Sequence, residues 1–179
     1  MLWKKRDKAG QVWIETVIYT LIAFVMIGLV LTFVKPEIEE LQDKAVLEQT
    51  LVVMEDIDNT ILSIKEVQGN KRLIELGIKE GSLKIDGEND TIFFEMESKH
   101  AFSQEGEPLD YGGVIVITQS IGDYNRIRLI NNYTEEYNIT FDGKDSPRTI
   151  SKSPIPYSLS IANQGEDAAG KIVIDLEIN

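Results

Sequence analysis

The stretch GQVWIETVIYTLIAFVMIGLVLTFVKP, residues 10–36, decides the fold because it contains the main apolar run of the chain. Nineteen residues from Thr16 to Val34 carry no formal charge, which is enough for one membrane-spanning helix. Glu15 stands at the edge of this run, where a carboxylate costs free energy if it enters a bilayer. The sequence therefore predicts a transmembrane helix and raises the question of why Glu15 is there.

The charge of −12 is divided sharply along the chain. Residues 1–10 carry a net charge of +3, whereas residues 35–179 hold fourteen basic and twenty-eight acidic side chains. The positive-inside rule keeps the basic end in the cytoplasm and places the acidic body outside the membrane. The negative charge of this body would repel the phosphates of nucleic acids, so we expect no nucleic-acid partner. The absence of cysteine excludes disulfides and thiol chemistry.

A second helical pattern follows the apolar run. Pro36 lacks a backbone donor and predicts a kink or a restart of the helix. The Gly69-Asn70 pair predicts the end of the helix. A helix over residues 11–67 would be about 85 Å long, so only its first part can lie in a membrane. The apolar face of its later part, at spacings of three and four residues, comprises Leu47, Leu51, Met54, Ile57, Ile61 and Ile64.

From residue 71 the hydrophobic period changes to two, which is typical of short strands between turns. The expected strands are Leu83–Ile85, Thr91–Glu97, Val114–Gln119, Arg126–Ile130, Tyr137–Phe141, Tyr157–Ile161 and Lys171–Ile178. We therefore predict an α+β fold, in which a long N-terminal helix precedes an antiparallel, sandwich-like β-rich head. The expected divisions are a basic leader at 1–10, an apolar helix at 11–35, an amphipathic helix at 36–68 and an extracytoplasmic head at 69–179.

A basic leader, a Gly-Gln pair and a glutamate precede the apolar run in a fixed order. The leader ends at Gly10, Gln11 follows, and Glu15 stands four residues further on. This arrangement resembles the class III signal peptide and N-terminal helix of archaeal type IV pilin-like proteins. That family often has Ser at the third and Leu at the ninth mature position, where this chain has Trp13 and Tyr19. The resemblance covers roughly residues 4–40, and the head matches only in its general kind.

The resemblance implies a role for Glu15. A prepilin peptidase would cut between Gly10 and Gln11 and create an α-ammonium at Gln11, with a pKa of about 7.7–8.0 in solution. Glu15 would pair with this cation in its own or a neighbouring helix, and the pair would set the register of assembly. A simpler interpretation places Glu15 at the cytoplasmic interface of an ordinary membrane anchor, beside the interfacial Trp13.

Three Asn-x-Ser/Thr sequons lie in the part of the chain expected outside the cytoplasm. They begin at Asn89, which stands in a turn signal, at Asn132, and at Asn138, which lies in or beside an expected strand. Each is a possible glycosylation site, and Asn138 is the least accessible of them by this pattern.

Two loops imitate ligand-binding motifs without the residues that such motifs require. Gly165–Lys171 has the spacing of a P-loop, but Ile172 stands where Ser or Thr must hold magnesium. Residues 86–97 imitate an EF-hand loop, but Thr91 replaces the required glycine. We interpret both as turns between strands. Since His100 is the only histidine and no catalytic set is visible, we expect no metal, no cofactor and no enzymatic activity.

The leading hypothesis from the sequence is a structural subunit of a type IV pilus-like filament. Its N-terminal helices would form a homo-oligomeric core, and its heads would serve adhesion or surface display. By the resemblance, its other partners would be the prepilin peptidase, an assembly ATPase and a membrane platform protein. The precursor would lie in the cell membrane with its N-terminus in the cytoplasm. The alternatives are a single-span anchored binding module that does not polymerise and, more remotely, an enzyme ectodomain.

Overall fold

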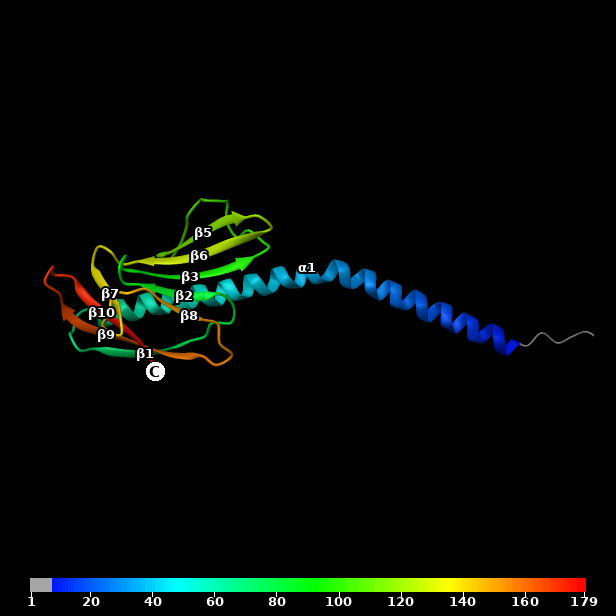
Figure 1. Cartoon of the computed structure of the whole chain (residues 1–179), viewed down its shortest axis with the longest axis horizontal. Coiled ribbons are helices and arrows are strands. Elements are labelled where there is room, and N and C mark those ends of the chain that lie inside the picture. The colour runs from blue at the N-terminus through cyan, green and yellow to red at the C-terminus, as the bar shows by residue number, and fades with distance from the viewer. Residues whose placement is uncertain (1–7) are drawn as a thin grey trace, which may run out of the picture. The chain divides into compact units, whose positions relative to one another are not determined.

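A computed structural model describes the backbone of residues 8–179 and the side chains of residues 12–179 (Figure 1). One long helix is followed by ten strands, which confirms the predicted α+β fold. The chain forms two compact units, one ending at Gln42 and the other covering Asp43–Asn179. The second unit contains the later part of the helix together with all the strands.

Helix α1 (Lys8–Ile64) is 57 residues long and contains Pro36 without a break. At about 1.5 Å per residue this length corresponds to about 85 Å, as the sequence predicts. The expected restart at Pro36 is not found, because the proline removes one N–H donor while helical bonds continue on both sides. The helix ends three residues before the expected Val67, and the left-handed residue that follows is Gly69, with φ 85°.

Six strands form an entirely antiparallel sheet. They are β2 (Ser82–Asp86), β3 (Thr91–Ser98), β4 (Leu109–Tyr111), β5 (Val114–Ile121), β6 (Tyr124–Asn132) and β8 (Arg148–Ser151). Their order is β4-β5-β6-β3-β2-β8. Side chains along β3 alternate between buried and half-buried or exposed positions, so one face of this sheet lies on the core.

Four strands form the second sheet, in the order β1-β9-β10-β7. They are β1 (Lys71–Leu76), β7 (Tyr137–Phe141), β9 (Tyr157–Glu166) and β10 (Ile172–Ile178). The described head is antiparallel, as predicted, except that β7 and β10 pair in parallel. After β7 the chain crosses to the other sheet as β8 and returns as β9, so the β9–β10 hairpin brings β10 beside β7 in the same direction.

The later part of α1 packs between the two sheets, as Figure 1 shows. Met54, Ile57, Ile61 and Ile64 are completely buried, as the spacing of the apolar face predicts. Two buried asparagines join the helix backbone to the sheets. Asn131 of β6 donates to the carbonyl of Met54 at 3.0 Å, and Asn163 of β9 donates to the carbonyl of Ile64 at 3.0 Å. The helix is therefore the centre of the head's core.

Candidate functional site

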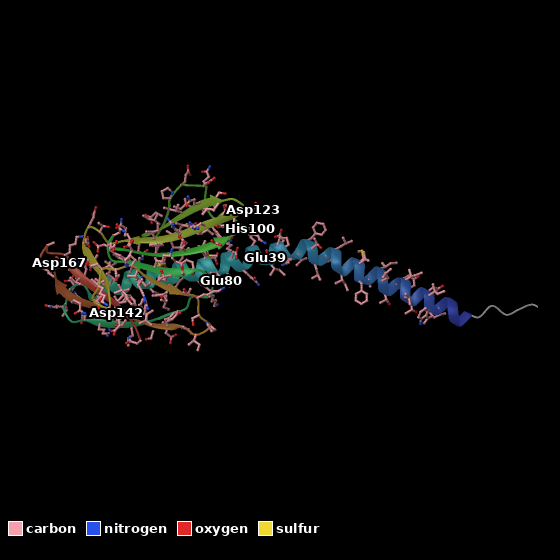
Figure 2. All side chains as sticks on the ribbon, viewed as in Figure 1. Glu39, Glu80, His100, Asp123, Asp142 and Asp167 are labelled. Carbon is pink, nitrogen blue, oxygen red and sulfur yellow. The ribbon has the colours of Figure 1, made fainter. Side chains whose placement is uncertain are left out.

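The first part of α1 presents apolar side chains on all sides (Figure 2). Every side chain from Val12 to Val34 is exposed within the described chain. The best window of this helix has a mean hydropathy of 2.7, and none of it is buried. The segment is therefore long and apolar enough to cross a membrane. Because the core of this chain does not bury it, lipid or another protein surface must shield it from water.

Three threonines are the main polar residues within this apolar part, and each has an internal partner. The hydroxyls of Thr16, Thr20 and Thr32 donate to the carbonyl four residues earlier, at 2.9, 2.8 and 2.9 Å. Since a hydroxyl without a partner is costly in hydrocarbon, these bonds make the segment compatible with lipid. The charged residue at the start of this segment is Glu15.

The residues of the predicted processing site lie in the first turns of α1. Gly10 and Gln11 belong to its backbone, while the side chain of Gln11 and residues 1–7 of the leader lie outside the described part. Glu15 is exposed and stands one helical turn after Gln11. This spacing fits the predicted pairing, which remains a prediction.

The three sequons differ in the environment of their asparagines. Asn132 is exposed, and its Oδ1 accepts hydrogen bonds from the backbone N–H of Thr134 at 3.0 Å and from the hydroxyl of Thr134 at 2.6 Å. Asn89 is also exposed, but its Nδ2 donates to Asp86 at 2.8 Å. Asn138 is half-buried in β7, and its Nδ2 donates to Asp167 at 3.3 Å. Asn132 therefore presents the most available amide nitrogen of the three.

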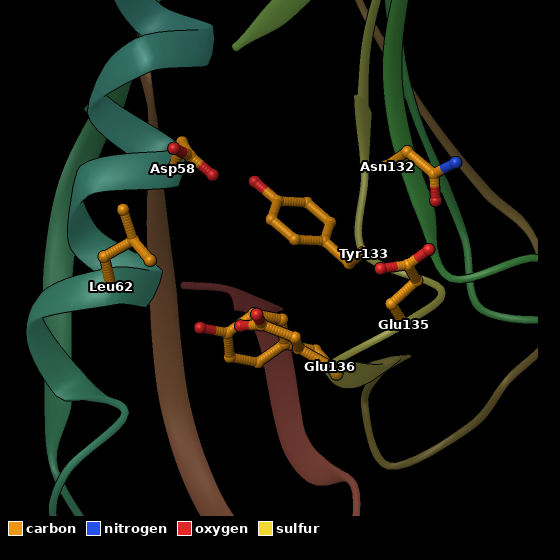
Figure 3. A pocket seen from close by; sticks show the side chains of 7 residues that line it. Asp58, Leu62, Asn132, Tyr133, Glu135 and Glu136 are labelled. Carbon is orange, nitrogen blue, oxygen red and sulfur yellow. The ribbon is translucent and has the colours of Figure 1, made fainter.

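A hollow of about 340 Å³ lies where the last turns of α1 face the segment that joins β6 to β7 (Figure 3). Its lining consists of Asp58, Leu62, Asn132, Tyr133, Glu135, Glu136 and Tyr137. Figure 3 shows the carboxyl group of Asp58 pointing toward the hydroxyl of Tyr133, with Glu135 on the other side of that ring. The hollow thus combines three carboxylates with two tyrosines.

The two tyrosines of the hollow are buried, and both have a raised pKa. Burial raises the pKa of Tyr133 far above its ordinary value, and the carboxylate of Asp58 raises it further. Burial also raises the pKa of Tyr137, with a smaller contribution from the charge of Glu136. Both phenols therefore stay protonated at neutral pH. Their rings meet edge to face, with centroids 5.8 Å apart and an interplanar angle of 87°.

A cluster of charges on the outer face of the six-stranded sheet was not predicted from the sequence. Glu95 of β3 accepts a hydrogen bond from Arg128 at 2.7 Å and one from Lys84 at 3.3 Å, and Arg126 lies 3.8 Å away. Lys84 and Arg128 also lie over the ring of Phe93, 5.5 and 5.8 Å from its centroid. The period-two pattern places these residues on one face, but only the strand pairing brings them together.

The two motif-like loops are turns between strands, as expected. The β9–β10 turn is held by Asp167, labelled in Figure 2, whose Oδ1 accepts from the backbone N–H of Ala169 and Lys171 at 2.8 and 2.9 Å. The β2–β3 turn contains Asp90 with φ 50°, and the carboxylate of Asp90 is paired with Lys171 at 3.0 Å. The carboxylate of Asp167 thus holds its own turn, whereas that of Asp90 joins the β2–β3 turn to Lys171 and to the backbone N–H of Ile139. Within the described residues, no group of three or more His, Cys, Asp or Glu side chains is placed to hold a metal ion.

No family model, no curated protein and no solved structure matches this chain.

Proposed function

We propose that this chain is a structural subunit of a type IV pilus-like surface filament, assembled through the first part of α1. The observation that carries the proposal is the exposure of every side chain from Val12 to Val34, in a helix whose first turns contain the Gly10-Gln11 pair and Glu15. A basic leader precedes this helix in the sequence. Exposed apolar side chains alone would support any membrane anchor. Their combination with the basic leader, the Gly10-Gln11 pair and Glu15 supports a pilin.

The exposed apolar side chains of this helix are covered first by lipid, in the precursor, and then by sister helices, in the filament. Burying one Val, Leu, Ile, Phe or Met side chain contributes about 1.5–3 kcal/mol, so this segment cannot remain in water. In the precursor, lipid covers it, and the hydroxyls of the threonines are satisfied within the helix. In the filament, helices of sister subunits cover the same side chains. The prepilin peptidase, the assembly ATPase and the membrane platform protein are the partners that this transfer requires.

Glu15 gives the assembly its register. An uncompensated carboxylate inside a bundle of apolar helices is costly, so a new subunit is stable only where Glu15 meets the α-ammonium at Gln11. The α-ammonium exists only after cleavage, which couples processing to assembly. The head, joined to the later part of α1, lies outside the cell, where it serves adhesion or surface display and presents its sequons for glycosylation.

Shearing of native cells tests the filament directly. We expect the chain in the sheared, sedimentable fraction as filaments visible by electron microscopy. Glu15→Ala should reduce this fraction at least about tenfold, because a buried charge pair contributes more than about 1.4 kcal/mol to correct placement. Glu37→Ala, an exposed acidic residue beyond the apolar run, is the matched control and should leave the yield unchanged. Normal filaments from Glu15→Ala cells would refute the register role.

The same experiment separates the filament from the anchored binding module. A non-polymerising module would stay entirely in the membrane fraction of sheared cells, regardless of residue 15. That result would refute the filament and retain only a membrane-anchored head.

A further inference from the structure

We propose that the heads of neighbouring subunits contact each other edge to edge, with β4 of one copy docked along β8 of the next. This contact rests on the proposed filament and adds to it a second assembly surface, separate from the apolar part of α1. The acidic side of the contact is β4 with its flanks, residues 105–113, which we call the β4 edge. The basic side is β8 with its flanks, residues 144–152, which we call the β8 edge.

The two edges lie at opposite sides of the same sheet. The order β4-β5-β6-β3-β2-β8 places one of these strands at each end, and no other strand of the described chain pairs with its outer side. Such a strand offers backbone N–H and C=O groups to a strand of another chain. In β8 the carbonyl of Ser151 already accepts from the hydroxyl of Tyr157 at 3.0 Å, so the open part is residues 148–150. Joining one edge to the other edge of the next copy is a head-to-tail contact, the kind from which open helical filaments are built.

The two edges carry opposite charge. The β4 edge has no basic residue and three carboxylates, namely Glu105, Glu107 and Asp110. The β8 edge has one carboxylate, of Asp145, and three basic side chains, namely Lys144, Arg148 and Lys152. Because residues 35–179 hold twice as many acidic as basic side chains, two heads repel each other unless a basic segment meets an acidic one. Complementary charge at the two edges therefore selects this orientation over others.

One copy cannot pair these charges by itself. With strands about 4.8 Å apart, the five steps from β4 to β8 separate the edges by roughly 24 Å along the sheet. Within the described residues, no ion pair involves Glu107, Asp110 or Arg148. Lys152 pairs with Glu80 at 3.0 Å, but both side chains are more than half exposed, so this pair contributes little. A second copy is what brings the two sets of charges together.

The apolar side chains of the β4 edge match a groove at the β8 edge. Leu109 and Tyr111 of β4 are 38% and 52% exposed, so both leave apolar area in water. The groove has a volume of about 400 Å³ and is lined by all four residues of β8 together with Phe141, Asp142, Tyr157 and Ile178. Arg148 lies over the ring of Phe141, 5.6 Å from its centroid, so aromatic surface and a guanidinium group meet there. A tyrosine, with its apolar ring and polar tip, suits such a mixed surface.

Cross-linking within sheared filaments tests the contact, and the absence of cysteine from the chain makes the test specific. Pro108→Cys and Thr149→Cys place one thiol at an exposed position of each edge. Filaments of the double variant are treated with a short bismaleimide and dissolved in SDS. We expect a ladder of covalent multimers, because every subunit carries both thiols, whereas either single variant can give at most dimers. The control pair, Leu73→Cys with Thr149→Cys, places one thiol on the exposed edge strand β1 instead and should give no ladder.

Charge reversal in the same double-cysteine chain tests the complementarity. Glu107→Lys and Arg148→Glu should each lower the yield of multimers about threefold, and the two reversals together should restore most of it. Glu88→Lys and Arg72→Glu, at exposed positions outside both edges, are the matched controls and should leave the yield unchanged. Equal melting temperatures of all variants in non-ionic detergent would verify that the heads are folded.

The outcomes separate this contact from the filament itself. A chain that never enters the sheared fraction would refute the filament, and the contact between heads with it. Filaments that form normally but give no ladder would refute the contact and leave the filament intact. An equal ladder from the control pair, or a ladder that both edge reversals leave unchanged, would overturn the contact in the same way.

Discussion

The side-chain amide of Asn163 in β9 donates a 3.0 Å hydrogen bond to the carbonyl of Ile64, the last residue of α1, and another of 3.0 Å to the carbonyl of Lys65. The last carbonyls of a helix lack partners within the helix, and here a strand almost a hundred residues away supplies them. In return, the Oδ1 of Asn163 accepts from the backbone N–H of Gly165 at 2.8 Å. A single buried side chain thus fixes the end of the helix on the four-stranded sheet.

Asn163→Ala should lower the free energy of unfolding of the head by about 1–3 kcal/mol, because buried carbonyls lose their donor. Urea unfolding in detergent, followed by the circular dichroism of the β-rich head, measures the loss. Gln164→Ala, an exposed neighbour on the same strand, is the control and should change little. Equal stability of the two variants would show that the cap contributes nothing.

Glu95→Gln should destabilise the head at neutral pH and less so in acid. Burial would raise the pKa of Glu95, but hydrogen bonds and charges of Arg128 and Lys84 outweigh it and hold the pKa below its ordinary value. A carboxylate with a lowered pKa stabilises the fold above its ordinary pKa of about 4.3, and this contribution is lost as the pH falls through the folded pKa.

We expect Glu95→Gln to cost about 1–2 kcal/mol at pH 7, a value reduced for the partial exposure of the basic partners. The difference from the unmodified chain should shrink as the pH falls below about 4. Urea unfolding between pH 3 and pH 7 measures it, with the exposed Glu97→Gln on the same strand as control. A difference that does not change with pH would contradict the ion-pair explanation.

Tyr133→Phe should make the head more resistant to alkali. Burial and the carboxylate of Asp58 raise the pKa of Tyr133 in the folded head. The neutral phenol therefore contributes its full stabilisation below the unfolded pKa of about 10. This contribution is lost as the pH rises from that value through the folded pKa. Phenylalanine cannot ionise, so the unfolding curve against pH should move upward. Asn131 keeps its bond to the carbonyl of Met54 but loses the Tyr133 hydroxyl as an acceptor at 3.2 Å, so we expect a loss of about 1–3 kcal/mol at pH 7. The exposed Tyr111→Phe should leave the alkaline limb unchanged.

Glycosylation, where the producing cell supplies it, should favour Asn132 over Asn138. The amide nitrogen of Asn132 is exposed and the hydroxyl of Thr134 already contacts its side chain, whereas Asn138 pairs within the sheet. Mass spectrometry of glycopeptides should find Asn132 occupied and Asn138 empty, and Thr134→Val should abolish occupancy of Asn132. A glycan at Asn138 alone would contradict this ranking.

Periodicity predicted the strands that bury several side chains and missed those that bury one or none. All seven expected strands are present, whereas β1, β4 and β8 were not expected. Each of the three lies at the edge of its sheet. In β1, with the sequence KRLIEL, four of the six residues are exposed, so it lacks the alternation that reveals a half-buried strand. The parallel pairing of β7 with β10 was equally unpredictable, because it follows from the path of the chain between sheets.

The N-terminal features were accessible from the sequence, whereas the hollow was not. The leader, Gly10, Gln11 and Glu15 all lie within the first fifteen residues, so their spacing can be read directly from the sequence. Asp58 and the Glu135-Glu136 pair come from distant segments, and only the packing of α1 against the β6–β7 connection unites them.

The most direct test of the filament is the N-terminus and intact mass of the chain recovered from sheared native filaments. We predict a chain that begins at Gln11, with the leader absent and a free α-ammonium one helical turn from Glu15. The membrane fraction of the same cells should retain some precursor. A chain in the sheared fraction that still begins at Met1, or a chain confined to the membrane at its full mass, would contradict processing and leave α1 as an ordinary anchor.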